Sequence, residues 1–225
     1  MKLITIIPAY NEVNVIKTVV EGALKYSDVL VVDDGSTDQT STLAREAGAM
    51  VVKHAQNRGK GAAIKTGLKK ALDYDYQVLV FMDGDGQHDP RHIPLLASGI
   101  GEADMVVGSR FKEGAPKGMA LQRRLSNSLT TKIMGFVTGY HLTDSQCGFR
   151  AISPRAARLF LDIPYNDYVY ESEVLYLASK KNLIINEKPI SCTYGGEKSY
   201  ITGISIFNYI IFTLKLFLRK LKRED

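Results

Sequence analysis

The sequence predicts an α/β fold in which helices cover a mostly parallel, Rossmann-like sheet. Two observations predict it. Short runs rich in β-branched residues alternate with longer segments of helical spacing, and short polar or glycine-bearing connections separate them. With 45% hydrophobic and 24% charged residues over 225 positions, the composition is that of an ordinary globular protein with a sizeable core.

The expected strands and helices follow one another in a regular order. Strands are predicted at residues 3–7, 29–32, 50–52, 78–82 and 105–107. Helices are predicted at residues 13–26, 40–47, 61–72 and 92–100. After Gly108 the alternation loosens, and further helices are predicted at residues 120–138, 154–161 and 170–180. We therefore expect one core domain, residues 1–198, followed by a C-terminal appendage.

The C-terminal segment, residues 199–225, has a different pattern. Its first 16 residues, 199–214, carry no charge, but this run is shorter than the ~18 apolar residues expected of a spanning helix. Basic side chains follow at Arg219, Lys220, Lys222 and Arg223. We expect an amphipathic, apolar helix with a basic end that lies at a membrane interface. The alternative is a helix packed on the core or on a second copy of the chain. Packing on a second copy predicts a homodimer through these helices.

The chain is basic, with a formal net charge of +5 and a pI of about 9.0. This balance suits anionic partners such as nucleotides and phospholipid headgroups, and nucleic acid is not among the partners we expect. Cys147 and Cys192 lie far apart, so no disulfide framework is predicted. The first apolar run is too short for a signal peptide. Together these features predict a cytoplasmic protein, peripheral on the cytoplasmic face of a membrane.

Polar clusters follow three of the predicted strands. PAYNE (8–12) comes after the first, DDGSTD (33–38) after the second and DGDGQHD (83–89) after the fourth. In such sheets ligands bind outside the carboxyl ends of the strands. The clusters therefore predict one shared ligand site rather than three unrelated turns.

Asp83 and Asp85 lie in a glycine-loosened loop that can bring both carboxylates toward one point. Mg²⁺ or Mn²⁺ favours such oxygen ligands, and substrate phosphates and water complete its shell. The alternative is a solvated Asp-Gly turn. An EF-hand is excluded because its required glycine and glutamate are absent. A zinc site at His88 and His92 is disfavoured because Pro90 separates them and no third ligand is near.

Two other segments predict contacts with a nucleotide. Asp33 and Asp34 end the second strand, where a carboxylate is well placed to accept hydrogen bonds from a base or ribose. In the segment NRGKG (57–61), Lys60 and free amides at a helix start could face phosphates. The alternative for this segment is simply a basic helix start, because it lacks the ending of a P-loop.

Six motifs in order carry a family resemblance. They are PAYNE (8–12), VVDDGSTDQT (31–40), NRGKGAA (57–63), DGDGQHDP (83–90), GSR (108–110) and DSQCGFR (144–150). This set resembles the family 2 glycosyltransferases and looks most like the dolichyl-phosphate mannose and dolichyl-phosphate glucose synthases. The resemblance covers residues 1 to about 200.

The resemblance implies a GT-A fold, a nucleotide-sugar donor, a divalent metal and inversion at the anomeric carbon. It implies that the nucleoside is held by Pro8, Tyr10, Glu12 and Asp34. Asp83 would lie near the ribose or the metal, and Asp85 and Gln87 would coordinate the metal. Arg110 and one of Arg123 or Arg124 would bind the acceptor phosphate.

A late loop, YGGEKS (194–199), is similar to the family segment that closes over the donor, and Lys198 there would neutralise the departing diphosphate. The arginine often found before the glycine pair is absent, and Thr193 and Tyr194 stand in its place.

The expected reaction is a direct displacement of a hexose from UDP or GDP onto a dolichyl or other polyprenyl phosphate. Such a phosphate is already anionic, so no strong base is required. The residues expected to take part in catalysis are Asp85, Arg110, Arg124, Asp144 and Lys198. One alternative is transfer to a sugar hydroxyl of a glycan with Asp144 as base. Another is a non-catalytic module that binds nucleotide sugars. DSQCGFR and NRGKG lean toward glucose and a uridine donor.

Overall fold

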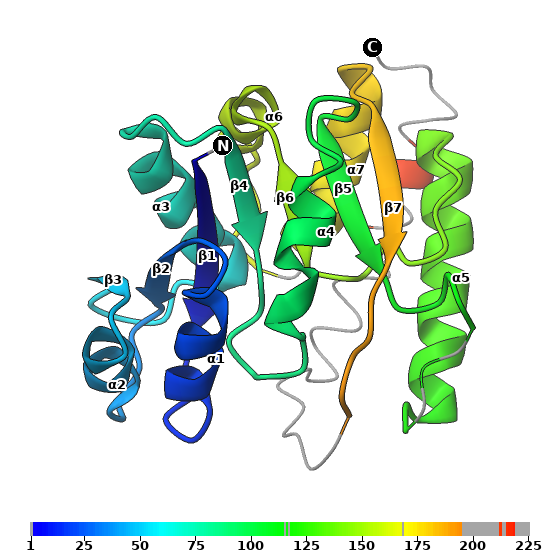
Figure 1. Ribbon diagram of the computed structural model, residues 1–225. Helices are drawn as coiled ribbons and strands as arrows, with labels where there is room; N and C mark the ends of the chain where they lie inside the picture. The colour runs from blue at the N-terminus through cyan, green and yellow to red at the C-terminus, as the bar shows by residue number, and fades with distance from the viewer. Residues whose placement is uncertain are drawn as a thin grey trace.

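The computed structural model describes residues 2–114, 116, 118–167, 169–194, 212 and 215–218 of the chain. Within this part, a seven-stranded sheet has the order β3-β2-β1-β4-β6-β5-β7 (Figure 1). Its strands are β1 (Leu3–Ala9), β2 (Asp28–Asp33), β3 (Met50–Lys53), β4 (Val78–Phe81), β5 (Met105–Ser109), β6 (Arg150–Ile152) and β7 (Ile185–Pro189). All neighbours pair in parallel except β6, which runs antiparallel to β4 and β5. The mostly parallel sheet is confirmed.

The central strands are apolar because both faces of the sheet are covered. All described side chains of β4 and β5 are buried, and so are most of those of β1 and β2. Helices α1 (Ile16–Ala23), α2 (Thr40–Glu46) and α4 (Ile93–Ala97) pack on one face. Helices α3 (Lys60–Leu72), α6 (Pro154–Phe160) and α7 (Val169–Lys180) pack on the other (Figure 1).

Two helices differ from the prediction. The first begins at Ile16 rather than at residue 13, because the chain first forms a turn in which the amide of Val15 donates to the carbonyl of Glu12. The predicted helix at 92–100 is divided into a 3₁₀ turn, Pro90–His92, and the short α4. The side chain of Asp89 accepts from the amide of Arg91 and caps the 3₁₀ turn.

Helix α5 (Leu121–Thr138) contacts α7 and stands beside the β7 edge of the sheet (Figure 1). Its amphipathicity is reversed. The buried face carries polar side chains, among them Asn127 and Thr131, whereas the exposed face carries large apolar ones. Leu121 is 69% exposed, Leu125 and Leu129 are each 62% exposed, and Phe136 is 54% exposed. We call these four side chains the α5 leucine stripe. The prediction of an amphipathic helix at 120–138 is confirmed, but its apolar face points outward.

Little of the C-terminal segment lies in the described part of the chain. Residues 212 and 215–218 are helical, and Phe217 stacks on Phe136 of the stripe with ring centroids 5.5 Å apart. The predicted homodimer contact and most of the predicted interfacial helix lie outside the described residues. Among the helices that the structure describes, none is both long and apolar enough to span a bilayer.

Candidate active site

The loops after β1 and β2 are tied together by hydrogen bonds at the carboxyl end of the sheet. The amide of Asn11, which has a φ of 57°, donates to the Ser36 hydroxyl at 2.9 Å. The amide of Thr37 donates back to the side-chain oxygen of Asn11 at 2.9 Å. The amide of Glu12 donates to the Thr40 hydroxyl at 2.8 Å. PAYNE and DDGSTD therefore form one continuous surface, as their places after adjacent strands predicted.

Asp33 and Asp34 hold these loops rather than facing outward. The Asp33 carboxylate is fully buried and accepts from the amide of Ser36 at 2.7 Å and from the Ser41 hydroxyl. Burial alone would raise the pKa of Asp33, but the hydrogen bonds from Ser36 and Ser41 hold it below its ordinary value. Asp34 is 4% exposed, and it accepts from His54 at 2.6 Å and from the amides of Arg58 and Gly59. Both aspartates shape the floor on which a nucleotide would lie.

The start of α3 differs from the expectation of free amides. The amides of Gly61 and Ala62 both donate to the carbonyl of Asn166, at 2.8 and 3.3 Å. Those of Arg58 and Gly59 are used by Asp34. The protein itself therefore satisfies the amides that the sequence suggested for phosphate, because the segment before α7 packs against this helix start. The expectation of free amides was wrong.

Lys60 points instead at two carboxylates. Its ammonium lies 2.6 Å from Asp83 and 2.7 Å from Glu171, which comes from α7. Burial disfavours the charge, but Asp83 and Glu171 raise the pKa of Lys60 far above its ordinary value. Burial likewise opposes the charge on Asp83, yet Lys60 and His88 lower the pKa of Asp83 to about 2. Lys60 and Asp83 therefore remain a charged pair throughout the neutral range.

Gly148 backs this ion pair. A Cβ placed on Gly148 would lie 2.9 and 3.0 Å from the carboxylate oxygens of Asp83 and 3.0 Å from the Lys60 ammonium. A side chain at this position would therefore force one of the two groups to shift. The glycine of DSQCGFR thus belongs to the site.

A surplus of negative charge gathers beside the pair. Burial, together with the charges of Asp85, Asp38 and Asp83, raises the pKa of Glu12 to about 7. The Asp85 carboxylate accepts from the amide of Gln87 at 3.0 Å and from its side chain at 2.7 Å. Asp85 and Gln87 are thus neighbours, as a shared metal role requires, whereas Asp83 is occupied by Lys60. In the part of the chain that is described, no cluster of three or more acidic, histidine or cysteine side chains is arranged to hold a metal.

His88 and His92 connect this loop to the chain that follows β7. His88 pairs with Cys192 in an isolated β-bridge, and its ring stacks on Phe149 at 5.0 Å. Burial lowers the pKa of His88 to about 4, so the imidazole is neutral. The amide of Ser191 donates to His92 at 3.0 Å. Through these contacts both histidines hold the loop after β4 against the chain that follows β7.

Arg110 and Asp144 form a buried, bidentate ion pair. Nε of Arg110 lies 2.6 Å from one carboxylate oxygen of Asp144, and Nη2 lies 2.9 Å from the other. Asn127 of α5 also donates to this carboxylate at 2.9 Å. Burial would raise the pKa of Asp144, but hydrogen bonds and charge from Arg110 lower it below its ordinary value. Asp144 is therefore the counter-ion of Arg110 in this structure, and its role as a base for a hydroxyl acceptor stays a prediction.

Arg123 and Arg124 have different surroundings. The guanidinium of Arg124 donates to the backbone carbonyls of Met119 and Pro116 at 3.1 and 2.9 Å, so it holds the approach to α5. Arg123 lies with Cζ 5.5 Å from the ring centroid of Tyr194. The Tyr194 hydroxyl also accepts from Nη1 of Arg110 at 3.3 Å. Of the two candidates for the acceptor phosphate, the structure brings Arg123 toward Arg110.

Comparison with known proteins decides the family. The model of glycosyl transferase family 2 matches residues 4–160. The chain belongs to glycosyl transferase family 2. This glycosyltransferase is 35% identical over 244 residues to a UDP-N-acetylglucosamine–dolichyl-phosphate N-acetylglucosaminyltransferase of Methanococcus voltae. The match covers 98% of this chain and 97% of that relative. It is 34% identical over 205 residues to an undecaprenyl-phosphate mannosyltransferase of Micrococcus luteus, with 85% of this chain and 83% of the relative covered.

A solved structure bears on the fold alone. Glucosyl-3-phosphoglycerate synthase of Mycobacterium tuberculosis superposes with a TM-score of 0.74 at 21% identity, covering 96% of this chain and 80% of that one. This likeness confirms the GT-A fold. The remaining roles implied by the resemblance stay predictions. Pro8 lies within β1 opposite Val32, Tyr10 follows that strand, and Lys198 is outside the described residues.

Several residues of the glycosyltransferase site were missed in the sequence. Glu171 lies on a predicted helix with no motif around it. Asn127 lies on α5. The only signal in the sequence was a polar side chain on the helix face that turns out to be buried. Arg150 is 3% exposed and donates to the carbonyls of Ser145 and Cys147, so it shapes the DSQCGFR loop. Arg150 is the first residue of β6, so the signal was a charged residue followed directly by apolar ones.

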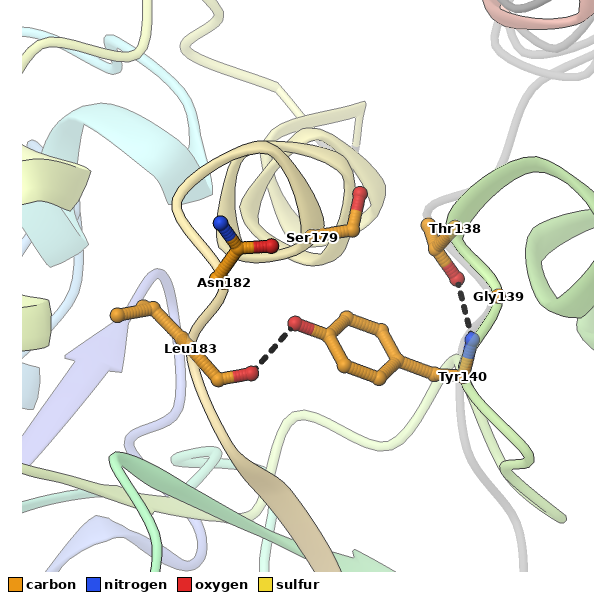
Figure 2. Close-up of a pocket in the computed structure, with 6 residues that line it drawn as sticks. All are labelled: Thr138, Gly139, Tyr140, Ser179, Asn182 and Leu183. Carbon is orange, nitrogen blue, oxygen red and sulfur yellow. Dashed lines mark hydrogen bonds between the residues drawn. The ribbon is translucent and has the colours of Figure 1, made fainter.

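The hollow in Figure 2 lies away from this site. It encloses about 230 Å³ between the ends of α5 and α7, where the Tyr140 hydroxyl donates to the Leu183 carbonyl at 2.7 Å. Leu183 comes just before β7 begins, so the hollow is at the amino end of that strand. The charged residues described above lie beyond the opposite, carboxyl ends.

Proposed function

We propose that this glycosyltransferase moves a hexose from a nucleoside diphosphate sugar to a polyprenyl phosphate at a membrane surface, with inversion at the anomeric carbon. One observation carries the proposal. Several carboxylates gather at the ends of β1 and β4. Arg110, at the end of β5, lies close enough to them for its charge to lower the pKa of Asp83. A metal-bound diphosphate suits the first group, and an anionic acceptor suits the second. The names of the Methanococcus and Micrococcus relatives support both assignments.

The residues at the donor side fit a divalent ion. Burial and, after it, the negative charges of Asp85, Asp38 and Asp83 raise the pKa of Glu12, and a nearby cation would relieve the effect of these charges. Asp85 and Gln87 would hold Mg²⁺ or Mn²⁺, while Lys60 already neutralises Asp83. When bound, the ion supplies positive charge to the leaving diphosphate. Asp34 and the loops it supports would receive the nucleoside, and Lys198 is expected to reach the diphosphate.

The acceptor side explains why no base is needed. A phosphate monoester is anionic near neutral pH, and Arg110 and Arg123 would hold it. One of its oxygens forms a bond to the anomeric carbon while the bond from that carbon to the diphosphate oxygen breaks. The diphosphate leaves with the electron pair, so no proton has to be removed. Asp144, buried as the counter-ion of Arg110, orients the guanidinium.

The α5 leucine stripe supports a membrane surface. Its four large apolar side chains point away from the protein core, on the helix whose first turn carries Arg123. An apolar face rimmed by cations is the pattern of a helix that lies in the headgroup region. With the leucine stripe in the headgroup region, Arg123 would lie at the same depth in the membrane surface as a lipid phosphate. Flotation with anionic liposomes tests membrane binding, and a form that ends at Glu197 shows how much of it comes from the residues after 197 rather than from α5.

The decisive experiment is a donor panel. UDP-glucose, UDP-N-acetylglucosamine and GDP-mannose are offered with a short polyprenyl phosphate or with the matching polyprenol, with and without chelator. We expect transfer to the phosphate alone, from one donor, and loss of transfer on chelation. Mn²⁺ binding followed by electron paramagnetic resonance should weaken in Asp85→Ala. Transfer to the polyprenol, or unchanged Mn²⁺ binding by this variant, would contradict the proposal.

A further inference from the structure

Glu187 of β7 receives several hydrogen bonds from the loop that carries Asp144. The amide of Thr143 lies 2.9 Å from each carboxylate oxygen of Glu187, and the amide of Asp144 donates to Oε1 at 3.0 Å. The hydroxyl of Thr143 donates to Oε2 at 2.9 Å. A carboxylate can accept several hydrogen bonds, so this one side chain serves two backbone amides and a hydroxyl. Glu187 therefore anchors the start of the DSQCGFR segment.

The same carboxylate is connected to the chain around Arg110. The hydroxyl of Thr143 also lies 2.6 Å from the hydroxyl of Ser109. Because Thr143 has a single hydroxyl proton and directs it at Glu187, Ser109 is the donor in this contact. The amide of Phe111 in turn donates to the Ser109 hydroxyl at 3.2 Å. The residues on both sides of Arg110 are thus tied to Glu187 through Thr143.

Two neighbouring strands support the two members of the Arg110–Asp144 pair. β5 and β7 pair in parallel with Val107 opposite Glu187, and Arg110 directly follows the last residue of β5. Arg110 is thus placed by β5, whereas Asp144 is held by Glu187 of β7. Because successive side chains of a strand point to opposite faces, a slip of one residue would turn Glu187 away from the loop. The register of these strands therefore sets how the guanidinium and the carboxylate meet.

Asp144 is not available to anchor its own loop. Its carboxylate already accepts from the guanidinium of Arg110, from the side chain of Asn127 and from the amide of Gln146. The amides at the start of the loop therefore depend on a second carboxylate, which Glu187 supplies. This division of roles leaves the oxygens of Asp144 directed at Arg110.

We propose that Glu187 is a positioning residue that holds the Arg110–Asp144 pair in place for the phosphate monoester of the acceptor. The inference rests on the proposed function, in which Arg110 contacts that phosphate, and adds the residue that sets where the guanidinium lies. Glu187 acts through the pair and takes no part in bond making. Its removal should therefore weaken acceptor binding and leave nucleotide binding unchanged, since the donor-side carboxylates Glu12 and Asp83 follow β1 and β4.

The test uses the full chain and geranyl phosphate as a soluble probe. Calorimetry measures its Kd, and UDP and GDP binding are measured in parallel. Glu187→Ala removes every contact of the carboxylate, whereas Glu187→Gln keeps one oxygen for the amides. We expect the Kd for geranyl phosphate to rise about tenfold or more in Glu187→Ala and about threefold in Glu187→Gln. Where transfer is measured, KM for the acceptor should rise more than kcat falls.

Asp104→Ala is the matched control. Asp104 precedes β5, and its carboxylate accepts from the amide of Ile184, which precedes β7, at 3.0 Å. This carboxylate therefore also ties β5 to β7, but at the amino ends of the two strands and away from Arg110. Asp104→Ala should lower the Tm as Glu187→Ala does, while its Kd for geranyl phosphate stays at the wild-type value.

An unchanged Kd for geranyl phosphate in the Glu187 variants overturns the inference alone, and Glu187→Gln decides the matter if Glu187→Ala does not fold. An equal loss of nucleotide binding in these variants also overturns it, as does an equal loss of acceptor binding in Asp104→Ala, since the effect would then be one of general stability. A wild-type protein that binds nucleotide but not geranyl phosphate overturns the proposed function, and the inference with it.

Discussion

The ammonium of Lys60 lies 2.6 Å from the carboxylate of Asp83, and Gly148 is the residue that leaves space for both. The pair joins the start of α3 to the end of β4, and Glu171 extends it to α7. A lysine thus occupies part of the carboxylate cluster and limits how many acidic side chains are left for a metal ion.

The pair should make stability depend on pH in acid. The folded-state pKa of Asp83 is about 2, below the ~3.9 of an unfolded aspartate, so its contribution is present above about pH 4 and is lost as the pH falls through 2. We expect Asp83→Asn to be less stable than the wild type by on the order of 2 kcal/mol at pH 6, with the two converging toward pH 2. Urea unfolding over this range measures it. Asp89→Asn, which removes the charge of the surface pair with Arg91 but keeps a side-chain oxygen to cap the 3₁₀ turn, should show a smaller effect. A pH-independent difference for Asp83→Asn would count against the ion pair.

Gly148→Ala should separate activity from stability. The added methyl group would displace the carboxylate of Asp83 or the ammonium of Lys60, both of which are ends of side chains that can shift. Because these distances call for a shift of less than about 1 Å, and a misplacement of about 1 Å can cost about 100-fold, we expect a rate loss of up to about tenfold while the fold survives. Steady-state transfer and thermal unfolding measure the two effects. Gly135→Ala, inside α5 and away from the pair, is the control, and equal activity of the two variants would exclude a role for Gly148 in the site.

Asp144→Asn should behave as the loss of a buried counter-ion. Arg110 would lose its bidentate partner, at a cost of on the order of 3 kcal/mol, and acceptor KM should rise. Because the folded-state pKa of Asp144 is lowered, the pair's stabilisation is present above the unfolded-state value of about 3.9 and fades as the pH falls below it. Chemical unfolding and acceptor titrations measure this. A large fall in kcat with unchanged stability and KM would instead support the prediction that Asp144 acts as a base.

The α5 leucine stripe gives a prediction for membrane binding. Replacing Leu125 and Leu129 by serine should weaken liposome binding by at least about tenfold, because each leucine contributes roughly 1.5–3 kcal/mol when fully buried. Both side chains are 62% exposed, so Tm should hardly change. Ile184→Ser is the matched control, since Ile184 is 57% exposed but lies outside α5. Flotation of the double variant at wild-type levels would rule out the stripe as the lipid-facing surface.

The sequence predicted the strands that consist of continuous apolar runs. Four of the first five strands are apolar runs with mostly buried side chains, whereas the edge strand β3 is partly exposed, and all five were predicted within two residues at each end. Strands β6 and β7 were missed because neither is such a run. The first has only three residues and starts with Arg150, and the second, INEKP, is a partly exposed edge strand.

For the site, sequence motifs identified the charged residues but not their partners. The amides after Asn57 were expected to face phosphate, and the Asn166 carbonyl takes those of Gly61 and Ala62. Asp144 was recognised as a candidate base, but its partners Arg110 and Asn127 could not be predicted. Such partners are set by long-range packing of α5 and α7 on the sheet, which local spacing does not encode.

The reversed amphipathicity of α5 has a consequence for how the enzyme meets its substrate. The inward face of this helix holds Asp144 through Asn127, and its outward face carries the leucine stripe. On the proposed orientation, one helix joins the lipid-facing leucine stripe to the Arg110–Asp144 pair, so the helix diameter sets the height of that pair above the bilayer. Encounters with acceptor then occur by lateral diffusion in two dimensions, and turnover follows the number of lipid phosphates per unit area rather than their bulk concentration.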